Sequence, residues 1–173
     1  MFDTDKRFVG KHAQYIHYLC KNKGAVNPNG INLFNRVIDL YITAPLIGLI
    51  YDRKGVVDRS ATGSATIQYK QISDNEYELL YVFQLVMLLA DKDKLTDSER
   101  LDRAFRDEAD ENKTKQNMEL FDSYALGGIE VLYELFEHDL NSTSSILMHL
   151  FELLRLNTPE DDKILAELDE LDK

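Results

Sequence analysis

The stretch that decides the fold is 111–137, ENKTKQNMELFDSYALGGIEVLYELFE. Its apolar residues recur every three or four positions, which is the spacing of one helix face. They are Met118, Phe121, Tyr124, Ala125, Ile129, Leu132 and Phe136. The pattern predicts one long helix over 111–137.

Two glycines, Gly127 and Gly128, lie inside this predicted helix. Each glycine costs about 1 kcal/mol relative to alanine in a helix interior. Such a pair is tolerated where another helix crosses closely or where the helix bends. We therefore single out Gly127 and Gly128 as candidate helix-packing residues, and we expect a Gly128→Leu substitution to break that packing.

Further helices are predicted along the rest of the chain. The expected spans are 6–22, 31–42, 45–51, 73–90, 96–107 and 144–156, with a last, acidic helix over 158–173. Ser73 and Thr96 are each followed three residues later by glutamate, which is a capping box at a helix start. Pro45 lacks an amide hydrogen, so we expect one helix to kink or stop near Thr43 and a short one to begin at Pro45. The helix over 73–90 is apolar on nearly all sides, which is typical of a helix at the centre of its domain.

These elements predict an all-α fold, with one domain over 1–173 built from seven or eight helices. The length suits one domain, and 44% apolar residues suffice for a sizeable core. Clean two-residue alternation, the pattern of a half-buried strand, is not seen. Helical order is interrupted by one irregular basic loop from Asp52 to Gln71, which contains a short extended piece at Thr66–Tyr69.

Charge is distributed unevenly along the chain. Residues 1–72 contain ten basic and five acidic side chains, whereas residues 73–173 contain ten basic and twenty-six acidic ones. DNA affinity depends on cations that contact phosphate, so a chain of net charge −11 is poorly suited to bind DNA on its own. The basic part could contact nucleic acid or an acidic protein; alternatively, the two parts face one another or are simply solvated.

The basic loop offers a candidate interaction surface. Together with Tyr41 just before it, Tyr51, Arg53, Lys54 and Arg59 combine aromatic rings with cations, a mixture that can stack on and neutralise single-stranded nucleic acid. The alternative is that Tyr41 and Tyr51 pack at the edge of the core and the cations are solvated.

No pattern for a catalytic, cofactor or metal site is present. The histidines, at 12, 17, 138 and 149, lack the spacing of metal ligands, and Cys20 has no nucleophile signature around it. The stretch 91–99 resembles a calcium-binding loop, but Leu95 and Thr96 stand where a ligand and a glycine are needed. We therefore expect a protein that is not an enzyme and uses no cofactor.

The cellular compartment is predicted from two further patterns. The apolar runs 37–51 and 79–90 fall short of the roughly 18 residues that suggest a membrane span. The first residues lack the pattern of a secretory signal. We expect a cytoplasmic protein without membrane contact.

One stretch also resembles a known family. Phe121-Asp-Ser-Tyr124-Ala125-Leu-Gly127-Gly128-Ile129-Glu-Val131-Leu132 is similar to the F-x-x-Y-A-x-G-G-L-x-x-L sequence of small accessory proteins encoded beside bacterial DNA phosphorothioation systems. In that family an earlier helix carries an alanine-to-glycine patch similar to Ala44-Pro-Leu-Ile-Gly48. In that family the stretch lies near the C-terminus, whereas this chain continues past it from 133 to 173. The resemblance implies a bacterial accessory role beside a DNA-modification or restriction system, and it carries over no catalytic residue.

Three functions are open at this point. The first is a non-catalytic accessory protein of such a defence system, which docks on a larger protein partner. The second is an acidic DNA mimic, in which Glu130, Glu134, Glu137 and Asp139 should line one exposed ridge with the acids of 107–111. The third is a small enzyme whose pocket holds two or more of His12, His17, His138, His149, Asp39 and Cys20. The apolar stripes of the last two helices also permit a homodimer.

Overall fold

The computed structural model describes residues 1–21, 32–59, 63–137 and 143–154. The elements in chain order are β1 (Lys6–Val9), α1 (Gly10–Leu19), α2 (Val37–Ile50), β2 (Ser64–Ile67), α3 (Tyr69–Asp74), α4 (Glu76–Leu89), α5 (Asp97–Phe105), a short 3-10 helix η1 (Asp107–Ala109), α6 (Glu111–Phe136) and α7 (Thr143–Leu154). The described part is 68% helical, with seven α-helices and 8% strand, which confirms the predicted all-α fold. The helix predicted over 158–173 lies outside the described residues.

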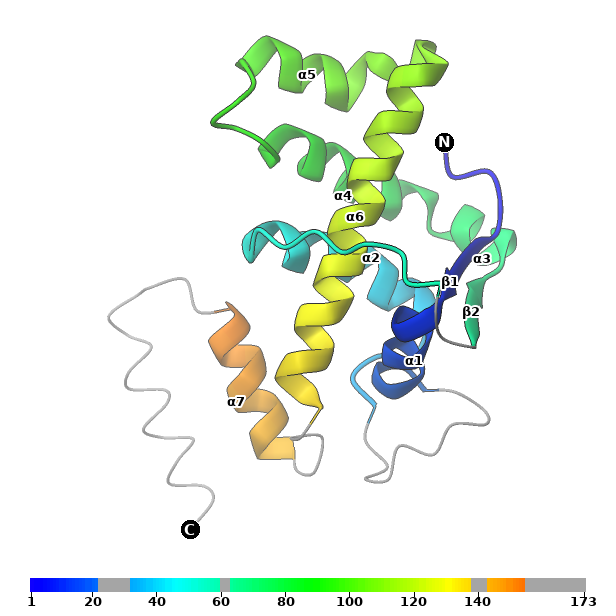
Figure 1. The fold of residues 1–173 in the computed structure, drawn as a ribbon, viewed down its shortest axis with the longest axis vertical. Helices are drawn as coiled ribbons and strands as arrows, with labels where there is room; N and C mark the ends of the chain where they lie inside the picture. The colour runs from blue at the N-terminus through cyan, green and yellow to red at the C-terminus, as the bar shows by residue number, and fades with distance from the viewer. Residues whose placement is uncertain (22–31, 60–62, 138–142, 155–173) are drawn as a thin grey trace.

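The longest helix, α6, lies at the centre of the fold, and α2 passes behind it in Figure 1. Large buried side chains from these two helices fill the middle of the core: Ile38, Tyr41 and Ile47 from α2, and Phe121, Tyr124 and Ile129 from α6. α4 packs beside α2, α5 packs on α4, and α1 packs on α6. The helices on this side of α6 therefore form one layer, in the order α5, α4, α2 (Figure 1).

The prediction that the helix over 73–90 occupies the centre is wrong. α4 does bury one side, with Leu79, Phe83 and Val86 in the core. Tyr77 and Tyr81, one turn apart, are instead 87% and 66% exposed. Because α6 takes the central position, α4 lies in the outer layer and keeps an uncovered apolar side.

α2 and α6 approach so closely that their backbones are in contact at glycines. A Cβ added to Gly128 would lie 1.8 Å from the carbonyl oxygen of Ala44, and one added to Gly48 would lie 2.1 Å from the carbonyl oxygen of Tyr124. α6 continues as one helix through this point. The glycine pair of the sequence thus belongs to a close helix crossing.

The helix predicted over 6–22 begins later than expected. Residues 6–9 form β1, which pairs antiparallel with β2 so that Lys6 lies opposite Ile67 and Val9 opposite Ser64. Gly10 follows with φ +62°, a conformation that side chains with a Cβ rarely adopt, and it separates the strand from α1. The extended piece expected at Thr66–Tyr69 begins two residues earlier, and Tyr69 already belongs to α3.

The predicted break near Thr43 is also wrong, because α2 runs without interruption from Val37 to Ile50 and contains Pro45. Proline removes one helix hydrogen bond and costs about 3 kcal/mol in a helix interior. The turns on both sides of Pro45 are held against α6 by the buried Tyr41 and Ile47. Tertiary packing therefore outweighs the local preference at this position.

Only one of the two predicted capping boxes is formed. At Thr96 the side chain accepts from the amide of Glu99, and the Glu99 side chain accepts from the amide of Thr96, so this box is confirmed. The box predicted at Ser73 is wrong, since Ser73 lies inside α3 and Asn75 caps α4 without a side-chain hydrogen bond.

Candidate functional site: a buried ion cluster and an apolar groove

A buried carboxylate, Glu130, joins three segments of the chain. Its side chain is 8% exposed. One oxygen, Oε1, accepts hydrogen bonds from Lys11 Nζ and His12 Nε2, each at 2.9 Å, and Oε2 accepts from Arg53 at 3.1 Å. Lys11 and His12 belong to α1, Arg53 to the segment after α2, and Glu130 to α6. We call these four residues the ion cluster.

Burial and charge act against each other in the ion cluster. Burial raises the pKa of Glu130, but the hydrogen bonds from Lys11 and His12 outweigh it, so the pKa lies below its usual value. For His12, burial lowers the pKa more than Glu130 raises it. At neutral pH the cluster therefore holds an ionised Glu130 beside a neutral His12, whose Nε2–H donates to the carboxylate.

Two residues of the candidate interaction surface are turned toward the body of the chain. Arg53 binds Glu134 through both terminal nitrogens, at 2.5 and 2.7 Å, in addition to Glu130. Lys54 lies 3.6 Å from Asp91 and 4.9 Å from the centre of the Tyr124 ring. The basic character expected of this loop is thus largely neutralised by acids of the second part of the chain.

The segment that carries these residues lies directly on α6. The amide of Gly55 donates to the carbonyl of Ser123 at 2.7 Å, and a Cβ on Gly127 would lie 2.0 Å from the carbonyl oxygen of Arg53. Gly127 and Gly128 therefore face different segments. The other two members of the candidate surface, Tyr51 and Arg59, are exposed, whereas Tyr41 is buried in the core and cannot stack on a ligand.

The basic and acidic parts of the chain face one another. Ion pairs between them are Lys6–Asp122, Lys11–Glu130, Arg53–Glu130, Arg53–Glu134 and Lys54–Asp91. This arrangement corresponds to the alternative in which the two parts of the chain face one another. The acids in these pairs are neutralised by cations of the same chain.

The acidic ridge expected of a DNA mimic is not formed in the described part. Glu130 is buried, and Glu134 is held by Arg53. The acids of 107–111 lie near the other end of α6, which is about 28 Å from Glu130 along the helix. Asp139 lies outside the described residues.

Among the residues considered for an enzyme pocket, Cys20 and Asp39 both contact Arg36, whereas His12 and His17 have partners elsewhere. His12 binds Glu130, whereas His17 Nε2 lies 3.2 Å from the carbonyl of Ser64. Cys20 is buried, and its sulfur donates to the carbonyl of Arg36. Asp39 accepts from the side chain of the same arginine. His138 and the His149 side chain lie outside the described residues, and within the described ones no group of three or more potential metal-ligating side chains occurs.

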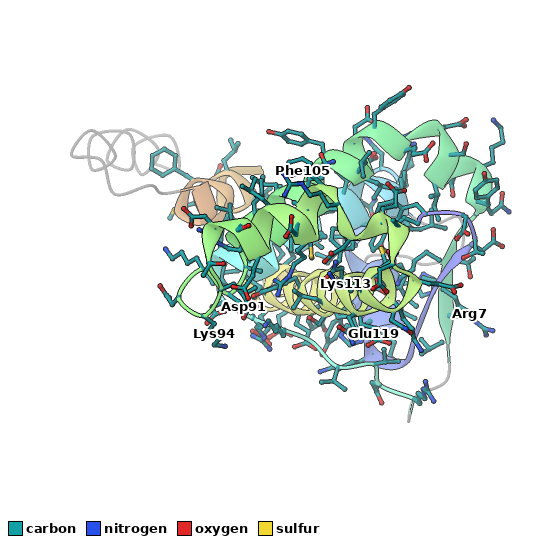
Figure 2. All side chains as sticks on the ribbon, turned by 90° about the horizontal axis from the view of Figure 1, so that it is seen from above. Arg7, Asp91, Lys94, Phe105, Lys113 and Glu119 are labelled. Carbon is teal, nitrogen blue, oxygen red and sulfur yellow. The ribbon has the colours of Figure 1, made fainter. Side chains whose placement is uncertain are left out.

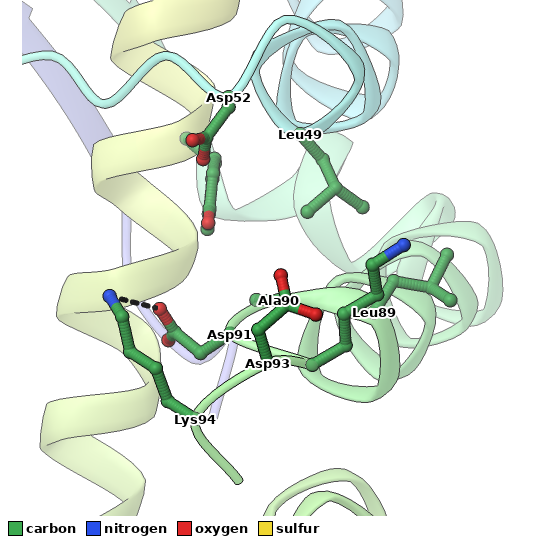
Figure 3. A pocket seen from close by; sticks show the side chains of 9 residues that line it. Leu49, Asp52, Leu89, Ala90, Asp91, Asp93 and Lys94 are labelled. Carbon is green, nitrogen blue, oxygen red and sulfur yellow. Dashed lines mark ion pairs between the residues drawn. The ribbon is translucent and has the colours of Figure 1, made fainter.

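A hollow of about 310 Å³ lies where α4 ends (Figure 3). Asp91, with φ +54°, lies 3.6 Å from Lys54 and 3.5 Å from both Lys94 and Arg103. Burial raises the pKa of Asp91, and the neighbouring cations more than reverse this. The calcium-like stretch thus presents Asp91 to protein cations. Figure 2 shows Asp91 and Lys94 at the end of the molecule opposite Arg7.

Two hollows lie along the contact between α2 and α4, and we call the surface between them the α2–α4 groove. Apolar residues of both helices border the hollows: Ile42 and Leu49 of α2, and Tyr81 and Leu89 of α4. At one end a shallow hollow of about 380 Å³ is bordered by Ile42, Tyr77, Glu78, Tyr81 and Val82. At the other end Leu49 and Leu89 border the hollow at Asp91. Because Ile42 and Tyr81 border one hollow, and Leu49 and Leu89 border the other, α2 and α4 run in the same direction along the α2–α4 groove.

Sequence reasoning missed the α2–α4 groove, although one signal for it is present. The helix over 73–90 is apolar on all sides, and such a helix needs cover on all sides. Tyr77 and Tyr81 add aromatic residues on the side of this helix that does not face the core. The pattern could have been taken as a sign of either a central helix or an unfilled docking face.

Comparison with family models, curated proteins and solved structures gave no match. In the described ranges, no helix combines the length and the apolar character that crossing a membrane requires.

Proposed function

We propose that this chain is a non-catalytic interaction protein whose α2–α4 groove receives a helix of a larger protein partner. The observation that carries the proposal is the exposure of Tyr77 and Tyr81 beside a shallow apolar hollow. Contiguous exposed apolar patches mark interaction sites in soluble proteins, and amphipathic helices bind in apolar grooves through residues one turn apart. Tyrosines are enriched among the residues that contribute most to such interfaces.

The accessory role in a bacterial DNA-modification or restriction system is the more specific form of this proposal. It is supported by the position of the two stretches that resemble the phosphorothioation-associated family. Gly128 of one stretch lies against Ala44 and Gly48 of the other. Both stretches therefore contribute to a single helix crossing, as expected if they are parts of one shared packing unit.

The ion cluster contributes to this function indirectly. It fixes α1, α6 and the segment after α2 to one another, and it uses the basic side chains that could otherwise have bound nucleic acid. A rigid body with an uncovered groove is suited to docking, because little order must be gained on binding.

The test begins with the tagged chain purified from its native host, followed by identification of the bound proteins by mass spectrometry. The partner is then purified and its dissociation constant measured for wild type, Tyr81→Asp and Val56→Asp. Val56 is an exposed apolar residue outside the groove and serves as the matched control.

We expect Tyr81→Asp to weaken binding at least tenfold, about 1.4 kcal/mol, and Val56→Asp to leave it unchanged. Equal affinities for the two variants would refute the groove as the docking site. A bound partner with no link to DNA modification or restriction would refute the defence-system role and leave the docking role intact.

A further inference from the structure

The α2–α4 groove carries a carboxylate without a cation at one of its ends. Glu78 borders the hollow that Tyr77, Tyr81, Ile42 and Val82 also line, and none of the described basic side chains borders it. Within the described residues, Glu78 forms no ion pair. A cation supplied by the partner would therefore meet an open carboxylate in this hollow.

Two other acids at this end of the groove are bound within the chain. Asp39 of α2 accepts a hydrogen bond from Arg36, and Asp74 of α3 lies 3.1 Å from Lys70. Their charges are thus already balanced by cations of the same chain. Glu78 differs from them because its charge is left for the occupant of the hollow.

The other end of the groove carries charges of both signs. The charged side chains that border its hollow are Asp52, Asp91, Lys92, Asp93 and Lys94. Asp91 is paired with Lys94 at 3.5 Å, a pair that Figure 3 marks, and it also lies 3.6 Å from Lys54. A cation of the partner would meet Lys92 as well as acids here, so it would gain less than a cation beside Glu78.

The two tyrosines beside Glu78 favour arginine over lysine. Tyr77 and Tyr81 are one turn apart on α4, and both rings are exposed. A guanidinium stacks on aromatic rings and binds a carboxylate through two parallel N–H groups, whereas the ammonium of lysine acts as a point charge. The hollow thus combines the two kinds of group that bind an arginine side chain.

The direction of the partner helix follows from the helix dipoles. α2 and α4 run in the same direction, and Glu78 lies in the first turn of α4. A partner helix antiparallel to both would place its C-terminal end at this hollow, and cations are favoured in the last turn of a helix. Ile42 and Leu49 are seven residues apart, which is about 10 Å of helix. The partner would therefore carry apolar residues over two turns, followed by the arginine.

The charge of the whole chain favours the same kind of partner. The net charge is −11, so a basic protein is attracted from a distance, whereas a second copy of this chain is repelled. Long-range attraction acts on any basic protein, and the hollow at Glu78 would then select among them.

We propose that the helix received by the α2–α4 groove has an arginine at its C-terminal end, and that this arginine binds Glu78 and stacks on Tyr77 and Tyr81. The inference rests on the function proposed above and adds the chemistry and the direction of the partner helix.

The test uses two labelled helical peptides of identical composition. Both carry leucines over two turns, and a single arginine lies one turn after the leucines in the first peptide and one turn before them in the second. Fluorescence anisotropy gives their dissociation constants for the full-length chain. Glu78→Gln removes the carboxylate. Glu76→Gln is the matched control, because Glu76 is exposed in the same helix turn but does not border the hollow.

We expect wild type and Glu76→Gln to bind the first peptide about three- to tenfold more tightly than the second. Glu78→Gln should bind the two peptides equally. A urea midpoint shared by both variants confirms that each has kept its fold, since each loses one acid from the first turn of α4. Equal affinity of wild type for the two peptides, binding of neither, or the same loss in both variants would each overturn the proposal.

Affinity for the natural partner separates this inference from the proposed function. If Tyr81→Asp weakens binding of the natural partner but Glu78→Gln and Glu76→Gln bind both peptides alike, the inference fails alone. If wild type selects the first peptide through Glu78 but Tyr81→Asp leaves binding of the natural partner unchanged, the proposed function fails alone.

Discussion

Gly128→Ala should destabilise the protein, even though alanine is the better helix former. The added Cβ would lie 1.8 Å from the carbonyl oxygen of Ala44 and 2.9 Å from the amide nitrogen of Gly48. A relaxed non-bonded contact needs roughly 3.5 Å, so the two backbones would have to separate by about 1.7 Å. Both obstacles are backbone atoms, which cannot rotate away as a side chain can.

The magnitude follows from opposing contributions. Alanine gains about 1 kcal/mol over glycine in helix propensity. Overpacking typically costs about 1–3 kcal/mol, and the upper end applies here because the obstacle is backbone. Separation of α2 from α6 also loosens the packing of Tyr41 and Tyr124, which adds roughly 1–2 kcal/mol. The net loss in the free energy of unfolding should be about 3–4 kcal/mol, which lowers the melting temperature by about 6–16 °C.

Urea denaturation followed by far-ultraviolet circular dichroism measures this loss. Gly63→Ala is the control, since Gly63 has φ +131° and no atom within 4 Å of the added Cβ, so it adds backbone strain without a steric clash. Gly128→Leu should be more severe than Gly128→Ala and prevent normal folding. A Gly128→Ala protein at least as stable as wild type would refute the close crossing.

Three further predictions concern the ion cluster and Cys20. Glu130→Gln removes the negative charge that Lys11 and Arg53 face. Because both cations still reach solvent, we expect the free energy of unfolding in urea to fall by about 1–3 kcal/mol. An unchanged midpoint would show that the ion cluster adds no stability. The urea midpoint should fall as the solution is acidified. A first fall is expected below pH 6.5, because the pKa of His12 is lower in the folded protein than in the unfolded chain, so protonation favours unfolding. A second fall is expected below pH 4.5, because the pKa of Glu130 is also lower in the folded protein, and a midpoint that is constant from pH 7 to pH 4 would contradict both pKa shifts. Burial raises the pKa of Cys20 to about 12, so a thiol reagent at pH 8 should label it only as fast as the protein unfolds, and immediate labelling would contradict this.

The elements that the sequence predicted correctly depend on local signals. The apolar spacing over 111–137 and the capping box at Thr96 are read within a few residues of chain, and both are found. The errors occur where a distant segment decides. Pro45 stays inside α2 because α6 holds the turns around it, and residues 6–9 are a strand because β2 pairs with them.

The candidate site was less predictable for the same reason. Glu130 was taken as one of several exposed acids, yet its burial depends on Lys11 and His12, more than a hundred residues earlier. The apolar residues of α2 and α4 were recognised. Which of their sides stays uncovered depends on the position of α6, and periodicity within one helix carries no information on that.

The crossing of α2 and α6 also has a consequence for folding kinetics. Tyr41 of α2 donates a hydrogen bond to Asp122 of α6 across 81 residues of chain. α4 and α5, by contrast, are neighbours in sequence and pack on each other directly. Loop-closure entropy must be overcome before distant contacts form, so we expect the α4–α5 hairpin to form early and folding to be slower than in bundles with short connections. During synthesis, α2 leaves the ribosome well before α6 does. The apolar surface of α2 then stays exposed until α6 is synthesised, so we expect a nascent-chain chaperone to bind α2.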